Sequence, residues 1–216
     1  NERVMIAGDY DADGVLASAV LTSFFQKIGF TNFSVYLPDR HNEKYGLSDK
    51  VIQQALAERA SLLVTVDCGV SNAAEVAKAS ELGIETIVTD HHLPPVDLPR
   101  AVAVINPKRA DSSYPFAELC GTAVAFKLVQ ALLARGQFGL PMGWEKWLLD
   151  LVALATVADM MPLVGENRVL VHFGLKVLQI SRRPGVVALA RHWRLPQAFL
   201  TEDDIAFVIG PRLNAA

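Results

Sequence analysis

The sequence predicts an α/β fold in which a parallel sheet covered by helices is followed by a helical region. In the first half of the 216 residues, short apolar runs alternate with segments of helical periodicity, which is typical of parallel strands joined by crossover helices. The apolar runs are continuous, as expected for strands that are buried on both faces. After Pro107 no further run of this kind occurs, so the second half is predicted to be helical.

The predicted elements follow one another in a regular order. Strands are expected at residues 4–7, 33–36, 62–66 and 84–88, and residues 102–105 are a candidate for a last strand. The helices between them are expected at residues 15–28, 48–58 and 72–82. Gly29 fits the position after a helix end, where a left-handed conformation is common, and Ser48 fits a helix cap. The later helices are expected to begin near Glu118, Trp144, Glu166, Pro184 and Thr201, after a proline-rich connection at residues 94–115.

Composition limits the class of protein. Hydrophobic residues make up 51% of the chain, which allows a sizeable core, yet no apolar run approaches the roughly 20 residues of a membrane-spanning helix. We therefore expect no membrane insertion. Cys68 and Cys120 lie far apart, with neither a CxxC pair nor a secretory leader, which predicts a reducing, cytoplasmic setting.

The charges are unevenly distributed along the chain. The net charge of −3 argues against a surface that is basic all over. One stretch is locally basic, because no acidic residue occurs between Glu166 and Glu202. Its basic residues are Arg168, Lys176, Arg182, Arg183, Arg191 and Arg194. Two interpretations stay open: the stretch is the solvated flank of a helix, or it is a face that binds a polyanion.

Acidic residues directly follow three of the predicted strands. In a parallel α/β sheet this is the edge at which ligands bind. The residues are Asp9, Asp11 and Asp13 after the first strand, Asp67 after the third, and Asp90, His91 and His92 after the fourth. Asp159 is a further acidic residue, in the otherwise apolar helical run at residues 151–161. Crowded carboxylates repel one another, so such a cluster requires compensating cations.

Carboxylates with one or two imidazoles suit Mn²⁺ or Mg²⁺, whereas a thiolate zinc site would need clustered cysteines. Each element alone has a simpler interpretation, because an aspartate after a strand is often a helix cap or a turn former. The Asp-Xaa-Asp repeat also resembles a calcium loop, but the glutamate expected at the twelfth position is missing. Cys68 is not expected to be a nucleophile, since the neighbouring Asp67 raises the pKa of its thiol. The convergence of three strand ends favours one shared ligand set.

Four segments resemble the four motifs of the DHH phosphoesterases. They are DYDADG, VTVDCG, VTDHH and VALATVADMMPL. The spellings GDYDADG, ELCGTAVAFKL and GPRLNAA resemble the RecJ-type members of that family, exonucleases that degrade single-stranded DNA from its 5′ end. The resemblance covers almost the whole chain. It implies a hydrolase of DNA repair and recombination that uses two divalent metal ions, Mn²⁺ or Mg²⁺, to activate water.

The resemblance also implies roles for individual residues. His92 is expected to face the scissile phosphate and Asp90 to orient the imidazoles. Asp67 is expected to bridge both ions, and Asp9 to be a ligand or a neighbour of the ligands. The implied metal ligands are Asp9, Asp11, Asp13, Asp67, His91 and Asp159. The candidates for contacts with phosphate or with the DNA backbone are Arg40, Arg212, Arg182 and Arg183, and ordinary surface ion pairs are the alternative for Arg40 and Arg212.

By the same resemblance, residues 1–107 would form the α/β DHH domain that binds metal. Residues 108–216 would form a helical region that completes the catalytic core with Asp159 and begins the connection to a DHHA1 domain. The ragged chain ends predict a fragment that lacks this domain and an OB-type domain. Single-stranded DNA is the expected partner, a single-strand-binding protein and a helicase are candidates, and a monomer is expected.

Two rival functions stay open. One is a different hydrolase of the same fold, acting on oligoribonucleotides, cyclic-dinucleotide products or a nucleotide 3′-phosphate. Its metal chemistry would be the same, so only the substrate separates it from a nuclease. The other is a non-catalytic scaffold, which the full set of acidic residues and histidines disfavours.

Overall fold

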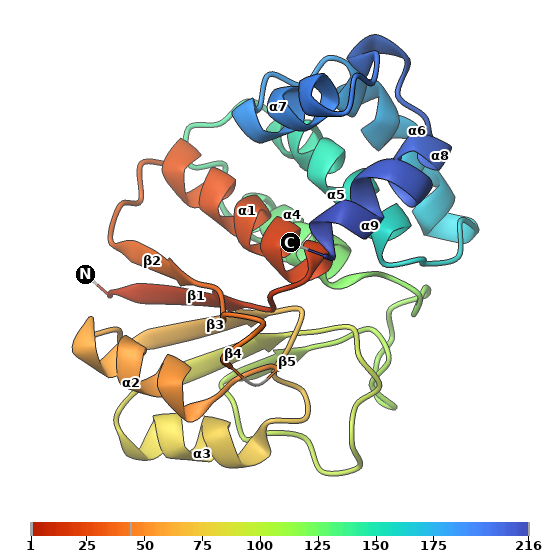
Figure 1. Cartoon of the computed structure of the whole chain (residues 1–216). Coiled ribbons are helices and arrows are strands. Elements are labelled where there is room, and N and C mark those ends of the chain that lie inside the picture. Colours follow the sequence, from red (N-terminus) through yellow and green to blue (C-terminus); the bar gives the residue numbers. More distant parts are fainter. Residues whose placement is uncertain (1, 44, 216) are drawn as a thin grey trace.

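The computed structural model describes residues 2–43 and 45–215 and has a five-stranded parallel sheet at its centre (Figure 1). The spatial order is β2-β1-β3-β4-β5, and all four pairings are parallel. The strands are β1 (Val4–Gly8), β2 (Phe33–Tyr36), β3 (Leu62–Val66), β4 (Glu85–Thr89) and β5 (Ala103–Ile105). The predicted fold class is confirmed, and the candidate strand at residues 102–105 is the edge strand β5.

The register of the sheet brings three strand ends level. Gly8 of β1 lies opposite Val66 of β3, and Val66 lies opposite Thr89 of β4. Parallel strands that end level present their next residues at the same edge of the sheet. These next residues are Asp9, Asp67 and Asp90.

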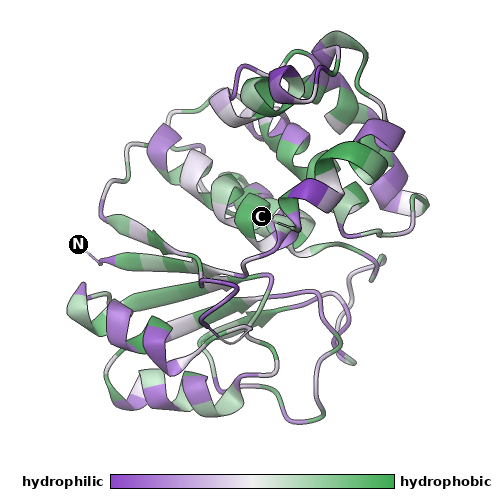
Figure 2. Ribbon diagram, in the orientation of Figure 1, coloured by the Kyte–Doolittle hydropathy of each residue, from purple (hydrophilic) through white to green (hydrophobic). Residues whose placement is uncertain are grey.

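Helices cover both faces of the sheet (Figure 1). The helices α1 (Ala12–Lys27) and α4 (Gly121–Arg135) lie on one face, and α2 (Asp49–Ala57) and α3 (Ala73–Glu81) lie on the other. Alternate residues of β1 serve the two cores, because Val4 and Ile6 pack with α1 and α4, whereas Met5 and Ala7 pack with α2 and α3. The inner strands are accordingly hydrophobic, whereas α2 and α3 carry both hydrophobic and hydrophilic residues (Figure 2).

The second half is helical, as predicted, and packs on the outer side of α1 and α4 (Figure 1). Its elements are η1 (Trp144–Leu148), α5 (Leu149–Ala158), α6 (Gly165–Gln179), α7 (Pro184–His192), η2 (Gln197–Phe199), α8 (Glu202–Asp204), the π-helix η3 (Ile205–Ile209) and α9 (Gly210–Leu213). The helix α5 is buried from Leu149 to Val157, between α1, α4 and α6, and its C-cap is Asp159. The main apolar core contains residues of β1, α1, α4 and α5, so it continues across residue 107.

The predicted helix ends are confirmed in part. The helix α1 begins at Ala12, three residues earlier than predicted, because the Asp11 side chain caps it by accepting a hydrogen bond from the Gly14 amide at 3.0 Å. Gly29 follows this helix with a φ of +75°, as predicted. Ser48 is the N-cap of α2, as predicted, although its side chain makes no capping hydrogen bond.

Two further features concern the cellular setting. Among residues 2–43 and 45–215, no helix has the length and apolar character needed to cross a bilayer. Cys68 and Cys120 are both buried and form no disulfide.

The helices α5 and α6 approach each other closely at Gly174, and a substitution there tests the packing. A Cβ atom at this position would lie 2.3 Å from the carbonyl oxygen of Leu149 and 2.5 Å from the Cβ of Ala153. Because backbone must move to make room, we expect Gly174→Ala to lower the free energy of unfolding by about 1–3 kcal/mol in urea denaturation. Gly185→Ala in α7 is the control, since its Cβ would meet nothing within 4 Å. Equal effects of the two substitutions would contradict the close contact.

Candidate active site

The loop after β1 is folded tightly around its three aspartates. The Asp9 carboxylate is buried and accepts a hydrogen bond from the Tyr10 amide at 2.7 Å. Asp11 caps α1 through the Gly14 amide. Gly14 packs directly on the loop, because a Cβ atom there would lie 2.4 Å from the backbone nitrogen of Asp9. This close approach turns the chain so that the aspartates face the carboxyl edge of the sheet.

The first turn of α4 holds Asp13 in place. The Asp13 carboxylate accepts hydrogen bonds from the amides of Gly121 at 2.6 Å and Thr122 at 2.8 Å, at the positive end of the helix dipole. The Thr122 hydroxyl also donates to the Asp13 carbonyl oxygen at 2.9 Å. No role was predicted for Gly121 or Thr122, and the only signal for them in the sequence is the segment ELCGTAVAFKL, which contains both.

Asp67 lies at the centre of the site. Its backbone is in the left-handed region, with a φ of +62°, which is uncommon outside glycine and is tolerated best by aspartate and asparagine. Its neighbour across the site is Gly121, where a Cβ atom would lie 2.5 Å from Asp67 Oδ1. The chain therefore brings α4 against the carboxylate at a position where only glycine fits.

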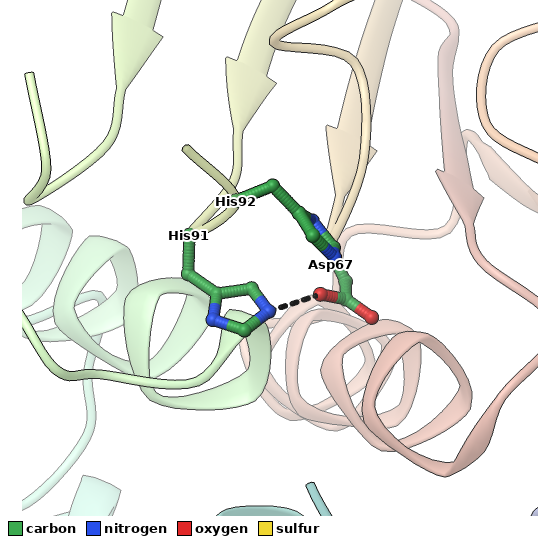
Figure 3. A group of neighbouring side chains, drawn as sticks. All are labelled: Asp67, His91 and His92. Carbon is green, nitrogen blue, oxygen red and sulfur yellow. Dashed lines mark ion pairs between the residues drawn. The ribbon is translucent and has the colours of Figure 1, made fainter. Parts of the chain in front are cut away.

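His91 points toward Asp67 (Figure 3). Its Nε2 atom lies 3.2 Å from Asp67 Oδ1, 3.7 Å from Asp13 Oδ2 and 3.7 Å from Asp159 Oδ2. Its side chain is buried, and burial lowers the pKa of the imidazole. The neutral imidazole is the form that binds metal, because one of its nitrogens has a free lone pair.

His92 has different surroundings from His91. Its ring is 45% exposed, and its Nδ1 atom lies 2.8 Å from Asp90 Oδ1. The hydroxyl of Tyr45 lies 3.1 Å from this Nδ1 atom and 3.2 Å from Nε2 of the same ring. Asp90 also accepts hydrogen bonds from the amides of His91, His92 and Val70. Asp90 was predicted to orient both imidazoles, but its side chain contacts only the His92 ring, and Tyr45 was not predicted at all.

Crowding and burial shift the pKa values of the carboxyl groups. Burial raises the pKa of Asp9 to about 6 and that of Asp159 to about 7. Burial also raises the pKa of Asp67 far above its usual range, and the neighbouring charges of Asp13 and Asp11 add to the rise. The ionised site is therefore unfavourable unless a cation balances its charge.

The donor atoms of the site fit divalent cations. Three groups bring their ligand atoms within 4.8 Å of one another: Asp13 with His91 and Asp159, Asp9 with Asp11 and Asp67, and Asp67 with His91 and His92. In the part of the chain that is described, Asp67 Oδ1, Asp159 Oδ2 and His91 Nδ1 are buried without a hydrogen-bond partner. Buried polar atoms are costly when nothing binds them. A set of carboxylate oxygens and imidazole nitrogens suits Mn²⁺ or Mg²⁺.

The four candidate arginines lie in different surroundings. The Arg40 guanidinium lies 4.8 Å from the centre of the Tyr10 ring, and its Nε and Nη2 atoms are buried without a partner among the described residues. Arg212 is exposed on α9, 5.5 Å from the Trp193 ring, and donates to the Val208 carbonyl oxygen.

Arg183 and Arg182 lie together at the start of α7, away from the acidic cluster. Arg183 forms an ion pair with the buried Asp150 at 2.9 Å and donates to the Ser23 hydroxyl. Its charge is therefore balanced within the helical region. Arg182 lines a cavity with Trp147 and Ile180.

Known proteins are similar to this chain in sequence and in fold. The model of the "DHH family, N-terminal domain" matches residues 3–156. The chain is 43% identical to the single-stranded-DNA-specific exonuclease RecJ of Dickeya dadantii, over 100% of this chain and 39% of that protein. It is 40% identical to the RecJ of Bacillus subtilis, over 99% of this chain and 26% of that protein. A crystal structure of exonuclease RecJ bound to manganese matches with a TM-score of 0.86 at 35% identity, and covers 100% of this chain and 53% of that chain.

The family model matches most of this chain, whereas the chain matches only part of each RecJ relative. The chain spans well under half the length of the two RecJ relatives, whereas the family model covers the sheet, α4 and most of α5. The predicted family resemblance is confirmed: the chain belongs to the DHH family, and within it resembles RecJ.

Proposed function

We propose that this chain is the catalytic core of a metal-dependent exonuclease that hydrolyses single-stranded DNA from its 5′ end, in DNA repair and recombination. The observation that carries the proposal is the convergence of Asp13, Asp67 and Asp159 on the Nε2 atom of His91. Three carboxylates and an imidazole can bind divalent cations, and the bound cations can in turn bind phosphate oxygens. The substrate is inferred from the relatives, which are described as single-stranded-DNA-specific exonucleases.

We assign two divalent ions, Mn²⁺ or Mg²⁺, to the acidic cluster. One would lie with Asp13, His91 and Asp159, the other with Asp9 and Asp11. Asp67 would bridge them, because its oxygens group with residues of both sets. Bound divalent ions would neutralise the phosphate and lower the pKa of an attacking water. The manganese-bound structure of a RecJ supports the choice of ion.

His92 is assigned to the scissile phosphate. Its half-exposed ring is held by Asp90 and by the Tyr45 hydroxyl. The hydrogen bond with Asp90 raises the pKa of His92, which favours the imidazolium. A fixed cation at this position can stabilise the negative charge that develops on the phosphate as the bond breaks.

Arginines are assigned to the remaining phosphates of the strand. Arg40 is well placed, because two of its nitrogens lack partners among the described residues and its charge acts on Asp9 of the metal-binding loop. Arg212, exposed on α9, is a second candidate. Arg182 is assigned to the DNA backbone. The same assignment for Arg183 requires its ion pair with Asp150 to open, so its loss would act first on stability.

The remaining assignments concern domains and partners. We propose residues 1–107 as the metal-binding domain and residues 108–216 as the region that supplies Asp159. We also propose a cytoplasmic, monomeric protein that meets a single-strand-binding protein and a helicase on DNA. A hydrolase of oligoribonucleotides or of nucleotide phosphates would use the same metal centre, and the similarity to RecJ favours DNA.

A substrate comparison tests the function. We expect this protein, with Mn²⁺, to release nucleotides from a long 5′-phosphorylated DNA strand labelled at either end, starting at the 5′ end. Turnover of a dinucleotide or a phosphorylated nucleoside should be slower by about 100-fold or more in kcat/KM, about 2.7 kcal/mol of lost transition-state stabilisation. Preference for the short substrates would identify the rival hydrolase instead.

Asp67→Asn is the matched control in the same assay. Asparagine keeps the shape and tolerates the left-handed backbone, but it removes the charge that the ions require. We expect hydrolysis to be abolished, while the metal-free variant unfolds at a higher temperature because the fold no longer buries a carboxyl group whose pKa is strongly raised. Normal activity in a folded Asp67→Asn protein would rule out this metal centre.

The two histidines are expected to differ in what their loss changes. His91→Ala should weaken Mn²⁺ binding by about 10-fold or more, and high Mn²⁺ should partly restore activity. His92→Ala should lower kcat at saturating metal and leave Mn²⁺ affinity nearly unchanged. Calorimetry and steady-state kinetics on both variants measure these quantities. Rescue of His92→Ala by metal, but not of His91→Ala, would reverse the two assignments.

Stability of the metal-free protein should fall as the pH rises from about 5 to 7. Burial raises the pKa of Asp9 to about 6 and that of Asp159 to about 7, and the pKa of Asp67 is raised well above its usual range. Unfolded carboxyl groups lose their protons at about pH 4, so in this window the folded state holds protons that the unfolded state has lost, and each rise in pH favours unfolding. The lowered pKa of His91 acts in the opposite direction below its usual value of about 6.5, but it is one group against three carboxyl groups.

Urea denaturation at several pH values measures this dependence. We expect a loss of about 2–4 kcal/mol with a chelator present, and a much smaller loss with saturating Mg²⁺. A flat or rising profile without metal would show that the carboxylates are not crowded in the folded state.

A further inference from the structure

The loop after β1 is tied to the last helix of the structure by one hydrogen bond. The Ala12 amide donates to the Asn214 side-chain oxygen Oδ1 at 2.8 Å. Ala12 lies between two proposed metal ligands, Asp11 and Asp13. Asn214 is 202 positions away and is the C-cap of α9. Ala12 and Asn214 lie in the segments DYDADG and GPRLNAA that carry the family resemblance, but no role was predicted for either residue.

Among the described residues, the partner of the Ala12 amide is the Asn214 side chain and not a side chain of the loop itself. Ala12 is the first residue of α1, so its amide has no partner within the helix. The Asp11 side chain already caps the Gly14 amide, and both oxygens of Asp13 accept amides of α4. Ala12 is 3% exposed, so water has little access to its amide.

Asn214 is the C-cap of α9, and the first residue of that helix packs on the end of α5 that precedes Asp159. The Asn214 amide donates to the Gly210 carbonyl oxygen at 2.9 Å. Gly210 is buried, and a Cβ atom there would lie 3.1 Å from the Cβ of Ala158, the residue before Asp159. The helix α9 therefore connects the aspartates of the first loop to the aspartate that comes from the helical region.

We propose that Asn214 is a positioning residue of the metal centre, which sets the distance between the carboxylates of Asp11 and Asp13 and that of Asp159. This inference rests on the proposed function. Asn214 lies behind the ligands and acts through the Ala12 amide. Loss of a partner that orients ligands typically weakens metal binding by about 10- to 100-fold. The Asn214 contact should fall in that range.

Two variants separate the hydrogen bond from the shape of the side chain. Asn214→Leu keeps the volume and removes the acceptor, whereas Asn214→Asp keeps an acceptor at the same place. Asn214→Ala repeats the loss with less bulk, in case leucine disturbs folding. Asn32→Leu is the control, because the Asn32 side chain also accepts a hydrogen bond, from Arg3, and donates one to the Glu2 carbonyl oxygen, away from the acidic cluster.

Two measurements are made on each folded variant. Calorimetry gives the Mn²⁺ affinity, and amide hydrogen exchange in the metal-free protein gives the protection of the Ala12 amide. We expect Asn214→Leu and Asn214→Ala to bind Mn²⁺ about 10-fold more weakly or worse and to lose protection at Ala12. Asn214→Asp should retain both properties within about 3-fold, and Asn32→Leu should change neither.

The outcomes also distinguish this inference from the proposed function. Wild-type affinity in Asn214→Leu, or equal weakening in Asn214→Asp and Asn214→Leu, would overturn the positioning role. If the wild-type protein itself bound no Mn²⁺, the proposed function would fail. The exchange rates would then still report whether Asn214 holds the Ala12 amide, and unchanged protection in Asn214→Leu would overturn the contact as well.

Discussion

Mutual repulsion of carboxylates governs the construction of this protein. Aspartates from three strand ends and one helix meet in a small, largely buried volume, where each ionised group disfavours the next. The fold has to hold them together before any cation arrives. It does so with backbone amides: the first turn of α4 neutralises part of the charge on Asp13, and the amides around Asp90 do the same for that carboxylate. The helix α4 therefore both packs in the apolar core and binds a carboxylate of the site.

The same constraint explains why the helical half is part of the site. A parallel sheet alone can present the aspartates that follow β1, β3 and β4. Asp159 comes from the other side of the cluster, at the end of a helix that is buried from Leu149 to Val157. Because α5 packs against α1 and α4, the position of Asp159 depends on the main apolar core. Packing of the core and geometry of the metal centre therefore depend on each other. Residues on both sides of residue 107 belong to the same apolar core, so this position is a boundary between α/β and helical segments of the sequence and not a gap in the packing.

Much of the fold could be predicted because it depends on local pattern. The strands at 33–36 and 62–66 were predicted with their observed bounds, since continuous apolar runs between turn residues leave little choice. The acidic residues were found because a parallel sheet collects its strand ends at one edge. What could not be predicted depends on contacts between distant residues. The pairing of Thr122 with Asp13 spans 109 positions, and the pairing of Arg183 with Asp150 brings together residues from two helices. Neither hydrophobic periodicity nor residue spacing in the sequence predicts such contacts.

The left-handed backbone at Asp67 has a consequence for attempts to change the metal preference of this centre. Softer or harder ions are usually selected by exchanging a carboxylate for histidine, cysteine or glutamate. At position 67 such a side chain would have to adopt a φ of +62° and enter space that Gly121 keeps clear. The central ligand is therefore confined to aspartate by geometry as well as by charge. Redesign of ion selectivity has room only at the periphery, at Asp159 and Asp11, where the side chains are partly exposed and the backbone is unstrained.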